Sequence, residues 1–337
     1  MILLTGATGF VGSRLLQALL DQGSRVVCLV RDPSKIKKQN NLTIIKADLE
    51  HSDILSDSSD FQLLKEVKVV VHLAAIYDLK ADSSSCYLAN VVATMNLAVL
   101  VKKLPLFKKF IFMSTVAVAG NHKGQVPIDT VDFDQGFPND YAKTKAQAEG
   151  FLRRSIDSSS LCILRSGIII GDSKDMSDFK PDGPYIAIKY ISDLFKKLPF
   201  IKIAPFLVLP INPKSRLPLV TIDVVVNSSL EAINKDYSGC HHLVLADYPL
   251  VLEFTKDLLI SLHIKSKLKA ISIKESHLNR FKSFPLPDSF PTELVDYMIM
   301  SPVYDLESEK NHFKALKDVS WSEIKEAFFR QAIKNIN

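Results

Sequence analysis

The chain has 337 residues, of which 47% are hydrophobic and 23% are charged, and its formal net charge is +5. This length and composition suit a large core with a second, smaller lobe, and they argue against a disordered or low-complexity protein. The positive charge is spread in small lysine clusters without a nucleic-acid-binding motif. We therefore expect no nucleic-acid partner, and a mild attraction for anionic substrates, phosphates or acidic carrier proteins.

The four cysteines lie far apart and form no C-x-x-C pair, which predicts free thiols in a reducing compartment. The first residues already have the pattern of a core strand, so neither a signal peptide nor a transmembrane segment is expected. The expected location is the cytoplasm. Adjacent His241 and His242 would point to opposite faces of a strand, and no metal site is expected.

A short apolar strand, a glycine-rich turn and an amphipathic helix follow one another within the first twenty residues. Residues 2–4 have the composition of a strand buried in a parallel sheet, and apolar residues then recur at helical spacing. Between them lie Gly6, Gly9 and Gly12. Glycines in such a turn allow a tight bend, a close approach of the backbone to a pyrophosphate, and close packing of helix on strand. The free N–H groups and the positive end of the helix would then face the phosphates.

The spacing G-x-x-G-x-x-G after Thr5 resembles the cofactor turn of the short-chain dehydrogenase/reductase family. The resemblance implies a Rossmann fold, a doubly wound parallel α/β sheet that binds a nicotinamide cofactor. It also implies which turn residues bind the cofactor: Gly6, Thr8, Gly9, Phe10, Val11 and Gly12.

Residues 25–30 predict the second strand, and the residue after this strand selects the cofactor. A carboxylate there would bind the ribose hydroxyls of NAD and repel the extra phosphate of NADP. This chain has Arg31 at that point, which favours NADPH. Asp32 follows directly and could reach the ribose in a different turn, so NAD stays open as an alternative.

The third strand, residues 42–46, leads to Asp48 and Leu49, where short-chain reductases place an acidic residue beside the adenine. The fourth strand, residues 67–73, ends at Ala74 and Ala75, whose small side chains would leave room for the cofactor. Residues 90–97 resemble the N-V-x-G-T-x-N-L helix of extended short-chain reductases, with alanine in place of glycine. The resemblance implies that Asn90 organises the cleft or a water molecule.

Ser114 and Thr115 stand at the carboxyl end of the fifth strand, where ligands of open α/β sheets bind. Tyr141 and Lys145 then supply the family's Y-x-x-x-K motif on one helix face. A second match, Tyr185 with Lys189, lies beyond the sixth strand and is interpreted as packing within the C-terminal lobe.

These residues predict a carbonyl reduction in which Tyr141 donates the proton. A free phenol titrates near pH ~10, and lowering that value by about three units requires roughly 4 kcal/mol of differential stabilisation. The ammonium of Lys145, one helical turn away, would supply it and would also hold the cofactor's ribose. By resemblance, Thr115 would orient the substrate carbonyl, and Ser114, Tyr141 and Lys145 would contact the cofactor.

The sixth strand is predicted at residues 161–170. The segments that follow, 171–185 and 219–225, are similar to the male-sterility or thioester-reductase-like branch of the family. That branch reduces fatty acyl or carrier-bound thioesters. Residues 194–213 form an apolar, proline-rich stretch that could line an acyl channel, contact a membrane surface, or pack as lobe core or subunit contact.

We expect residues 1–171 to form the NADP-binding domain, with 219–246 returning to it, and 172–218 with 247–337 to form a smaller, mostly helical substrate lobe. The predicted function is an NADPH-dependent reductase of a carbonyl or acyl thioester, on an aldehyde or a substrate carried by CoA or a carrier protein. The chain could form a homodimer. Two alternatives are a sugar-nucleotide epimerase with bound NAD and a non-catalytic NADPH-sensing scaffold. A dehydratase is disfavoured because Val116 and Ala117 replace its Asp-Glu pair.

Overall fold

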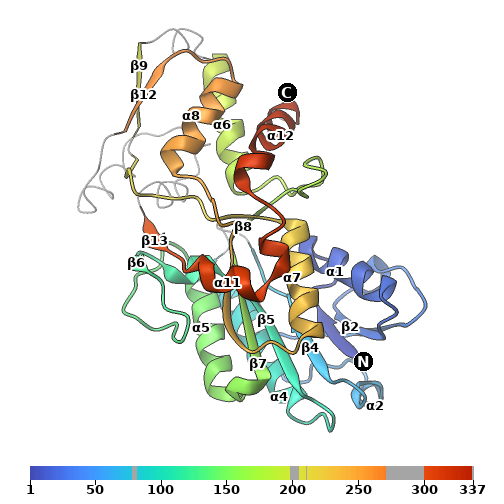
Figure 1. Ribbon diagram of the computed structural model, residues 1–337. Coiled ribbons are helices and arrows are strands. Elements are labelled where there is room, and N and C mark those ends of the chain that lie inside the picture. The colour runs from blue at the N-terminus through green and yellow to red at the C-terminus, as the bar shows by residue number, and fades with distance from the viewer. Residues whose placement is uncertain (78–81, 198–204, 210, 271–299, 336–337) are drawn as a thin grey trace. The chain divides into compact units, whose positions relative to one another are not determined.

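The computed structural model describes residues 1–77, 82–197, 205–209, 211–270 and 300–335, which fall into two compact units (Figure 1). The first unit comprises Met1–Gly120, Pro127–Ser166 and Val224–Leu243. The second comprises Asn121–Val126, Gly167–Asp223 and Val244–Asn337. Part of the apolar stretch 194–213 lies outside the described residues.

A seven-stranded parallel sheet in the order β11-β7-β5-β4-β1-β2-β3 forms the centre of the first unit. Strands β1 and β2 are buried along their whole length, because helices cover both faces of a parallel sheet. The strand order reverses between β1 and β4, and this reversal confirms the predicted doubly wound α/β fold. The strands are β1 (Ile2–Thr5), β2 (Val26–Val30), β3 (Leu42–Lys46), β4 (Val69–His72), β5 (Lys109–Thr115), β7 (Leu161–Ser166) and β11 (Gly239–Leu243).

Helices α4 and α5 share one core cluster with the strands through Leu97, Ala148 and Leu152, whereas α1 contacts β1 and β2 outside that cluster. Figure 1 shows these helices flanking the sheet. The helices of the unit are α1 (Phe10–Asp21), α2 (Phe61–Leu64), α3 (Ser83–Tyr87), a π-helical segment (Leu88–Val92), α4 (Ala93–Val101), α5 (Asp140–Ser155) and α7 (Ile222–Asn234), which enters the unit at Val224. Short 3-10 helices lie at Pro33–Lys35, Ser58–Asp60, Val116–Ala119 and Ser158–Ser160.

Within its described residues, the second unit combines helices with three two-stranded parallel sheets, which pair β10 with β8, β12 with β9, and β13 with β6. Its core contains a cluster of aromatic rings from α8 and α12, in which Phe254 stacks on Trp321 at 5.7 Å. The elements are β6 (Lys123–Gln125), β8 (Ile168–Ile170), α6 (Pro184–Lys197), β9 (Phe206–Leu209), β10 (Leu219–Thr221), α8 (Val251–Ser261), β12 (Lys267–Ala270), β13 (Ser301–Val303), α11 (Leu306–His312), a 3-10 helix (Lys314–Leu316) and α12 (Trp321–Lys334).

The predicted sixth strand is two strands in the structure. β7 ends at Ser166, and Ile168–Ile170 forms β8, which pairs with Leu219–Thr221 instead of with the large sheet. The prediction of one strand over 161–170 was wrong because a continuous apolar run does not reveal a change of pairing partner.

Helix Ser83–Val101, which joins α3, the π-helical segment and α4, is long and apolar enough to cross a membrane by length and composition. The sequence predicted a helix over residues 90–97 but not an apolar helix of this length. Half of its most apolar window is buried within the protein, and Leu97 and Val101 belong to the core cluster of the sheet. This packing is that of a core helix.

The glycine turn brings α1 close to β1 and β4. Gly6 has a φ of +73°, and a Cβ atom on it would lie 2.6 Å from the backbone nitrogen of Ala74. A Cβ atom on Gly12 would lie 2.0 Å from the carbonyl oxygen of Gly6. The turn therefore excludes side chains at both positions.

His72, the last residue of β4, is fully buried and bonded at both ring nitrogens. Its Nδ1 lies 2.7 Å from the hydroxyl of Thr5, and its Nε2 lies 2.9 Å from the hydroxyl of Thr94. The Thr94 hydroxyl donates to the Asn90 carbonyl, so its oxygen accepts from Nε2–H and the ring is neutral. Burial lowers the pKa of His72 to about 3. Both ring nitrogens of this core histidine are therefore satisfied.

We expect Gly12→Ala to destabilise the protein by about 2 kcal/mol, because the new methyl group overpacks the turn. Gly150→Ala in α5 is the matched control, since its Cβ would approach other atoms no closer than 3.4 Å. The control should be neutral or stabilise the helix by up to ~1 kcal/mol. Urea unfolding of both variants measures the difference, and equal stabilities would contradict the packing argument.

His72 should make the protein less stable in acid. The unfolded histidine binds a proton near pH ~6.5 and the folded one does not, so the free energy of unfolding falls as the pH drops below that value. Between pH 7 and 5 this one residue accounts for about 2 kcal/mol. Between pH 7 and 5, the free energy of unfolding of His72→Gln should therefore fall by about 2 kcal/mol less than that of the unmodified protein, as measured by urea unfolding at both pH values. An unchanged pH dependence in the variant would refute the assignment.

Candidate active site

A pocket of about 240 Å³ opens in the first unit at the carboxyl ends of β1, β2, β3 and β4. The predicted cofactor residues that line it are Gly6, Thr8, Gly9, Arg31, Asp48, Leu49, Ala74 and Ala75. Asp32, the alternative ribose contact, also lines the pocket. The sequence did not predict the other lining residues, which are Leu29, Val30, Lys35, Ala47, Glu50, Leu73, Ile76, Ala89 and Ala93. Phe10, Val11, Gly12, Ser114, Tyr141 and Lys145 are not part of its lining.

The phosphate end of the pocket is formed by the start of α1. Gly9 occupies the N-cap position and has no side chain to cap the helix, and Phe10, Val11 and Gly12 form the first turn. The N–H groups of a first turn have no partner within the helix, and they carry the positive end of the helix dipole. This arrangement fits a pyrophosphate group.

The opposite end of the pocket carries the charged residues that follow β2. Arg31 is 73% exposed, and its Nη1 lies 3.7 Å from Oε1 of Glu50. The Asp32 carboxylate accepts from the hydroxyl and the backbone nitrogen of Ser34, at 2.6 and 3.0 Å. These hydrogen bonds lower the pKa of Asp32. They also direct its carboxylate toward the start of the 3-10 helix that follows, which Asp32 caps.

Tyr141 lies in the first turn of α5, which begins at the N-cap residue Asn139. The Asn139 side chain accepts from the backbone nitrogen of Ala142 at 2.9 Å. The ring of Tyr141 is half-buried and forms a T-shaped pair with the Tyr77 ring, with 5.0 Å between centroids. Sequence reasoning missed Tyr77, although an aromatic residue shortly after Ala74 and Ala75 was a visible signal.

Lys145 is buried at the carboxyl end of β5. Its Nζ donates to the carbonyl of Met113 at 2.6 Å and lies 4.0 Å above the ring of Phe112. Burial lowers the pKa of Lys145 to about 7, and the nearby charge of Glu149 acts in the opposite direction. The ammonium group is thus held beside the strand end that carries Ser114 and Thr115.

The two hydroxyl residues at the end of β5 have different partners. Thr115 accepts from the backbone nitrogen of Ala117 at 3.2 Å, which leaves its own O–H able to donate. The buried Ser114 hydroxyl donates to Oε2 of Glu149 at 3.0 Å. Ser114 is therefore bonded to the protein interior in this structure.

Asn90 lies in the π-helical segment and connects three parts of the site. Its Oδ1 accepts from the backbone nitrogen of Ile76 at 2.9 Å, and its Nδ2 donates to the hydroxyl of Thr144 at 3.0 Å. Thr144 directly precedes Lys145 on α5. Asn90 thus ties the loop after β4 to the helix that carries Tyr141, and π-helical insertions of this kind are frequent at functional sites.

Sequence reasoning also missed the buried pair Glu149 and Arg165, whose side chains have no exposed surface. Arg165 stands inside the apolar strand β7, and Glu149 lies one helical turn after Lys145. A charged residue within an apolar strand is a usable signal, because an arginine is rarely buried without a carboxylate partner.

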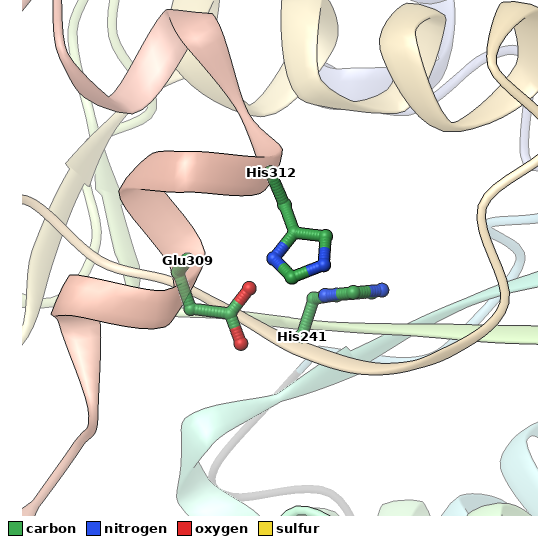
Figure 2. A group of neighbouring side chains, drawn as sticks. All are labelled: His241, Glu309 and His312. Carbon is green, nitrogen blue, oxygen red and sulfur yellow. The ribbon is translucent and has the colours of Figure 1, made fainter.

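Figure 2 shows three side chains with metal-ligating atoms. Glu309 and His312, three residues apart on α11, belong to the second unit, and His241 belongs to β11 of the first. The placement of the two units relative to each other is not determined, so these side chains carry no metal assignment.

Comparison with known proteins identifies the family. Residues 4–229 match the model of the male sterility protein family, an NAD-binding family. The hybrid PKS-NRPS synthetase pvhA of Talaromyces variabilis is 32% identical over 179 residues, which cover 51% of this chain and 4% of the synthetase. The chain spans less than half the length of the first curated relatives it matches.

Two solved structures share the fold over nearly the whole chain. The terminal R domain from the myxalamid PKS-NRPS pathway has a TM-score of 0.72 at 20% identity, covering 99% of this chain and 90% of that one. UDP-glucuronic acid 4-epimerase from Bacillus cereus has a TM-score of 0.66 at 19% identity, covering 99% of both chains. The family match, the doubly wound sheet and the glycine turn together show that this chain belongs to the male sterility protein family, within the extended short-chain dehydrogenase/reductases.

Proposed function

We propose that this protein is an NADPH-dependent reductase that converts a carbonyl or acyl thioester of a hydrophobic substrate, with Tyr141 as the general acid. One observation carries the proposal. At the carboxyl end of one sheet, the structure combines a pocket suited to a dinucleotide with a half-buried tyrosine and a buried lysine one helical turn apart.

The pocket residues fit a nicotinamide dinucleotide. The turn around Gly6, where any side chain would collide with Ala74, leaves the backbone free to approach a pyrophosphate. Gly9 and the first turn of α1 would hold the phosphates, and Ala74 and Ala75 would leave space beside β4. Asp48 and Leu49 would contact the adenine. When bound, the cofactor supplies the hydride.

Arg31 supports NADPH over NADH. It lines the pocket directly after β2, together with Lys35, and both can pair with an additional phosphate on the ribose. The competing candidate, Asp32, uses its carboxylate to cap its own turn. A carboxylate held in that way is not directed at ribose hydroxyls.

Tyr141 would give its proton to the substrate oxygen as negative charge develops there. Lys145 would stabilise the resulting phenolate, because a cation nearby lowers the pKa of a phenol. A lysine whose own pKa is about 7 can exchange its proton near neutral pH, and developing charge on Tyr141 would favour its ammonium form. The free O–H of Thr115 would orient the substrate carbonyl, and Asn90 would hold α5 against the loop after β4.

The relatives support a thioester substrate. The similarity to a hybrid PKS-NRPS synthetase and to a terminal R domain of such a pathway favours an acyl group attached to CoA or a carrier protein. An aldehyde substrate fits the same proposal, because its reduction needs the same hydride donor and the same proton donor, Tyr141. The second candidate is a sugar-nucleotide epimerase, favoured by the full-length similarity to the Bacillus cereus enzyme.

Arg31→Ala should weaken NADPH binding by about 10- to 100-fold and leave NADH binding almost unchanged, because a charged hydrogen bond to phosphate contributes about 1.5–3 kcal/mol. Arg25→Ala is the control, since Arg25 is a surface residue paired with Glu66 at 2.7 Å and does not line the pocket. Calorimetric titration measures both cofactors. Tighter binding of NADH than NADPH, or NAD that co-purifies with the protein, would favour the epimerase.

Tyr141→Phe should lower kcat for NADPH oxidation with long-chain acyl thioesters or aldehydes by about 100- to 10,000-fold, the contribution of a general acid. The dissociation constant for NADPH should stay within a few-fold. Tyr87→Phe, at a tyrosine that is 45% exposed, is the control and should retain the activity. Absence of turnover by the unmodified protein across acyl thioesters, aldehydes and ketones would refute the reductase proposal.

A further inference from the structure

The carboxylate of Glu149 is the centre of a buried network in the first unit. Oε1 accepts from Nη2 of Arg165 at 2.6 Å and from Nε and Nη2 of Arg153 at 3.0 and 2.9 Å. Oε2 accepts from Nε of Arg165 at 3.1 Å and from the Ser114 hydroxyl at 3.0 Å. One carboxylate therefore joins two guanidinium groups to the end of β5.

The two arginines use their remaining N–H groups on the loop that precedes α5. Arg165 donates to the carbonyls of residues 127 and 130, at 2.6 and 2.8 Å. Arg153 donates to the carbonyls of residues 128 and 129, at 2.8 and 3.1 Å. Four consecutive carbonyls are thus bound by side chains that Glu149 holds in place.

The same face of α5 is hydrogen-bonded to β5 at two neighbouring positions. Lys145 and Glu149, one turn apart on α5, bond to adjacent residues of β5, the carbonyl of Met113 and the hydroxyl of Ser114. Thr115 follows immediately. Two hydrogen bonds one turn apart fix both the axial position and the rotation of α5 relative to β5. The positions of Tyr141 and Thr115 therefore depend on these two bonds.

We propose that Glu149 is the positioning residue of this site: it locks α5 to the carboxyl end of β5 and sustains the positive charge of Lys145. The proposal rests on the proposed function, in which Lys145 acts as a cation beside Tyr141. Glu149 itself touches neither substrate nor cofactor. If Glu149 only formed a structural ion pair with Arg165, its removal would not change the charge of Lys145.

Among the charges around Lys145, the carboxylate of Glu149 is the one that favours the ammonium form of the lysine. Among the described residues, the groups around Lys145 and its network are Glu149 and Arg153 on α5, with Tyr141 one turn before Lys145 on the same helix, neutral His72 on β4, the Phe112 ring and Met113 carbonyl on β5, Arg165 on β7, and His242 on β11, 3.4 Å from Arg165. Burial lowers the pKa of Lys145, and Glu149 raises it. Without the carboxylate, Arg165 would add to the destabilisation of the ammonium form.

The test is the titration of Lys145 in Glu149→Gln, read from the Cε resonance of selectively ¹³C-labelled lysine and assigned with Lys145→Arg. We expect the midpoint of Lys145 to fall by about one pH unit or more in Glu149→Gln, and Glu149→Asp to restore most of the shift. Glu66→Gln removes a surface carboxylate as the charge control and should change nothing. An unchanged midpoint in folded Glu149→Gln would overturn the proposal.

The activity of the same variants separates this inference from the proposed function. If the unmodified protein reduces an acyl thioester, aldehyde or ketone, Glu149→Gln should lower kcat roughly fivefold at pH 7. The alkaline limb of the pH–rate profile should then lie about one pH unit lower than in the unmodified protein. A lower kcat with an unshifted limb would reduce Glu149 to a structural role and overturn the proposal. If the unmodified protein does not turn over, the reductase proposal fails, and the Lys145 resonance still decides the role of Glu149.

Ser114→Ala provides a second test if Glu149→Gln does not fold, because it leaves both buried charges in place. The amide of Ala117 donates to the Thr115 hydroxyl at 3.2 Å, so its hydrogen exchange reports the position of Thr115. We expect faster exchange at Ala117 with the Lys145 midpoint unchanged. Exchange equal to that of the unmodified protein would show that the Ser114–Glu149 bond does not position Thr115.

Discussion

The close approach of α1 to the sheet at the glycine turn is the constraint on which the nucleotide unit depends. Gly12 can pack against the carbonyl of Gly6 only because neither residue has a side chain, and this contact sets where the helix begins. The start of α1 then lies at the point where the strand order reverses. A crevice outside the carboxyl ends of the strands follows from that reversal, and the pocket lies in it.

Buried charge determines the other half of the site. Lys145, Glu149 and Arg165 are each almost completely removed from water, which is costly unless each ion finds a partner. The structure meets this condition by sharing the one carboxylate between two arginines and by giving the lysine a backbone carbonyl. Groups held in this way have few alternative positions, and such rigidity is what an acid–base pair requires.

The sheet, the pocket and the tyrosine–lysine pair all belong to the first unit, whereas α6 and the aromatic cluster belong to the second. The family match covers residues 4–229, so it includes all of the candidate catalytic residues and only part of the second unit. The residues proposed for hydride transfer therefore all lie within one compact unit. The choice of substrate rests on relatives whose similarity to this chain covers about half of it.

The sequence by itself determined most strands of the large sheet, the glycine turn and about half of the residues that line the pocket, because apolar runs, helical periodicity and small residues are local signals. Gly6, Gly9, Arg31 and Ala74 could be placed in the pocket from the rule that the carboxyl ends of parallel strands converge. Only the tertiary structure decided which partners the polar side chains choose. Ser114 bonds to Glu149 across 35 positions and Asn90 to Thr144 across 54, and no local pattern specifies contacts between segments that far apart in the chain.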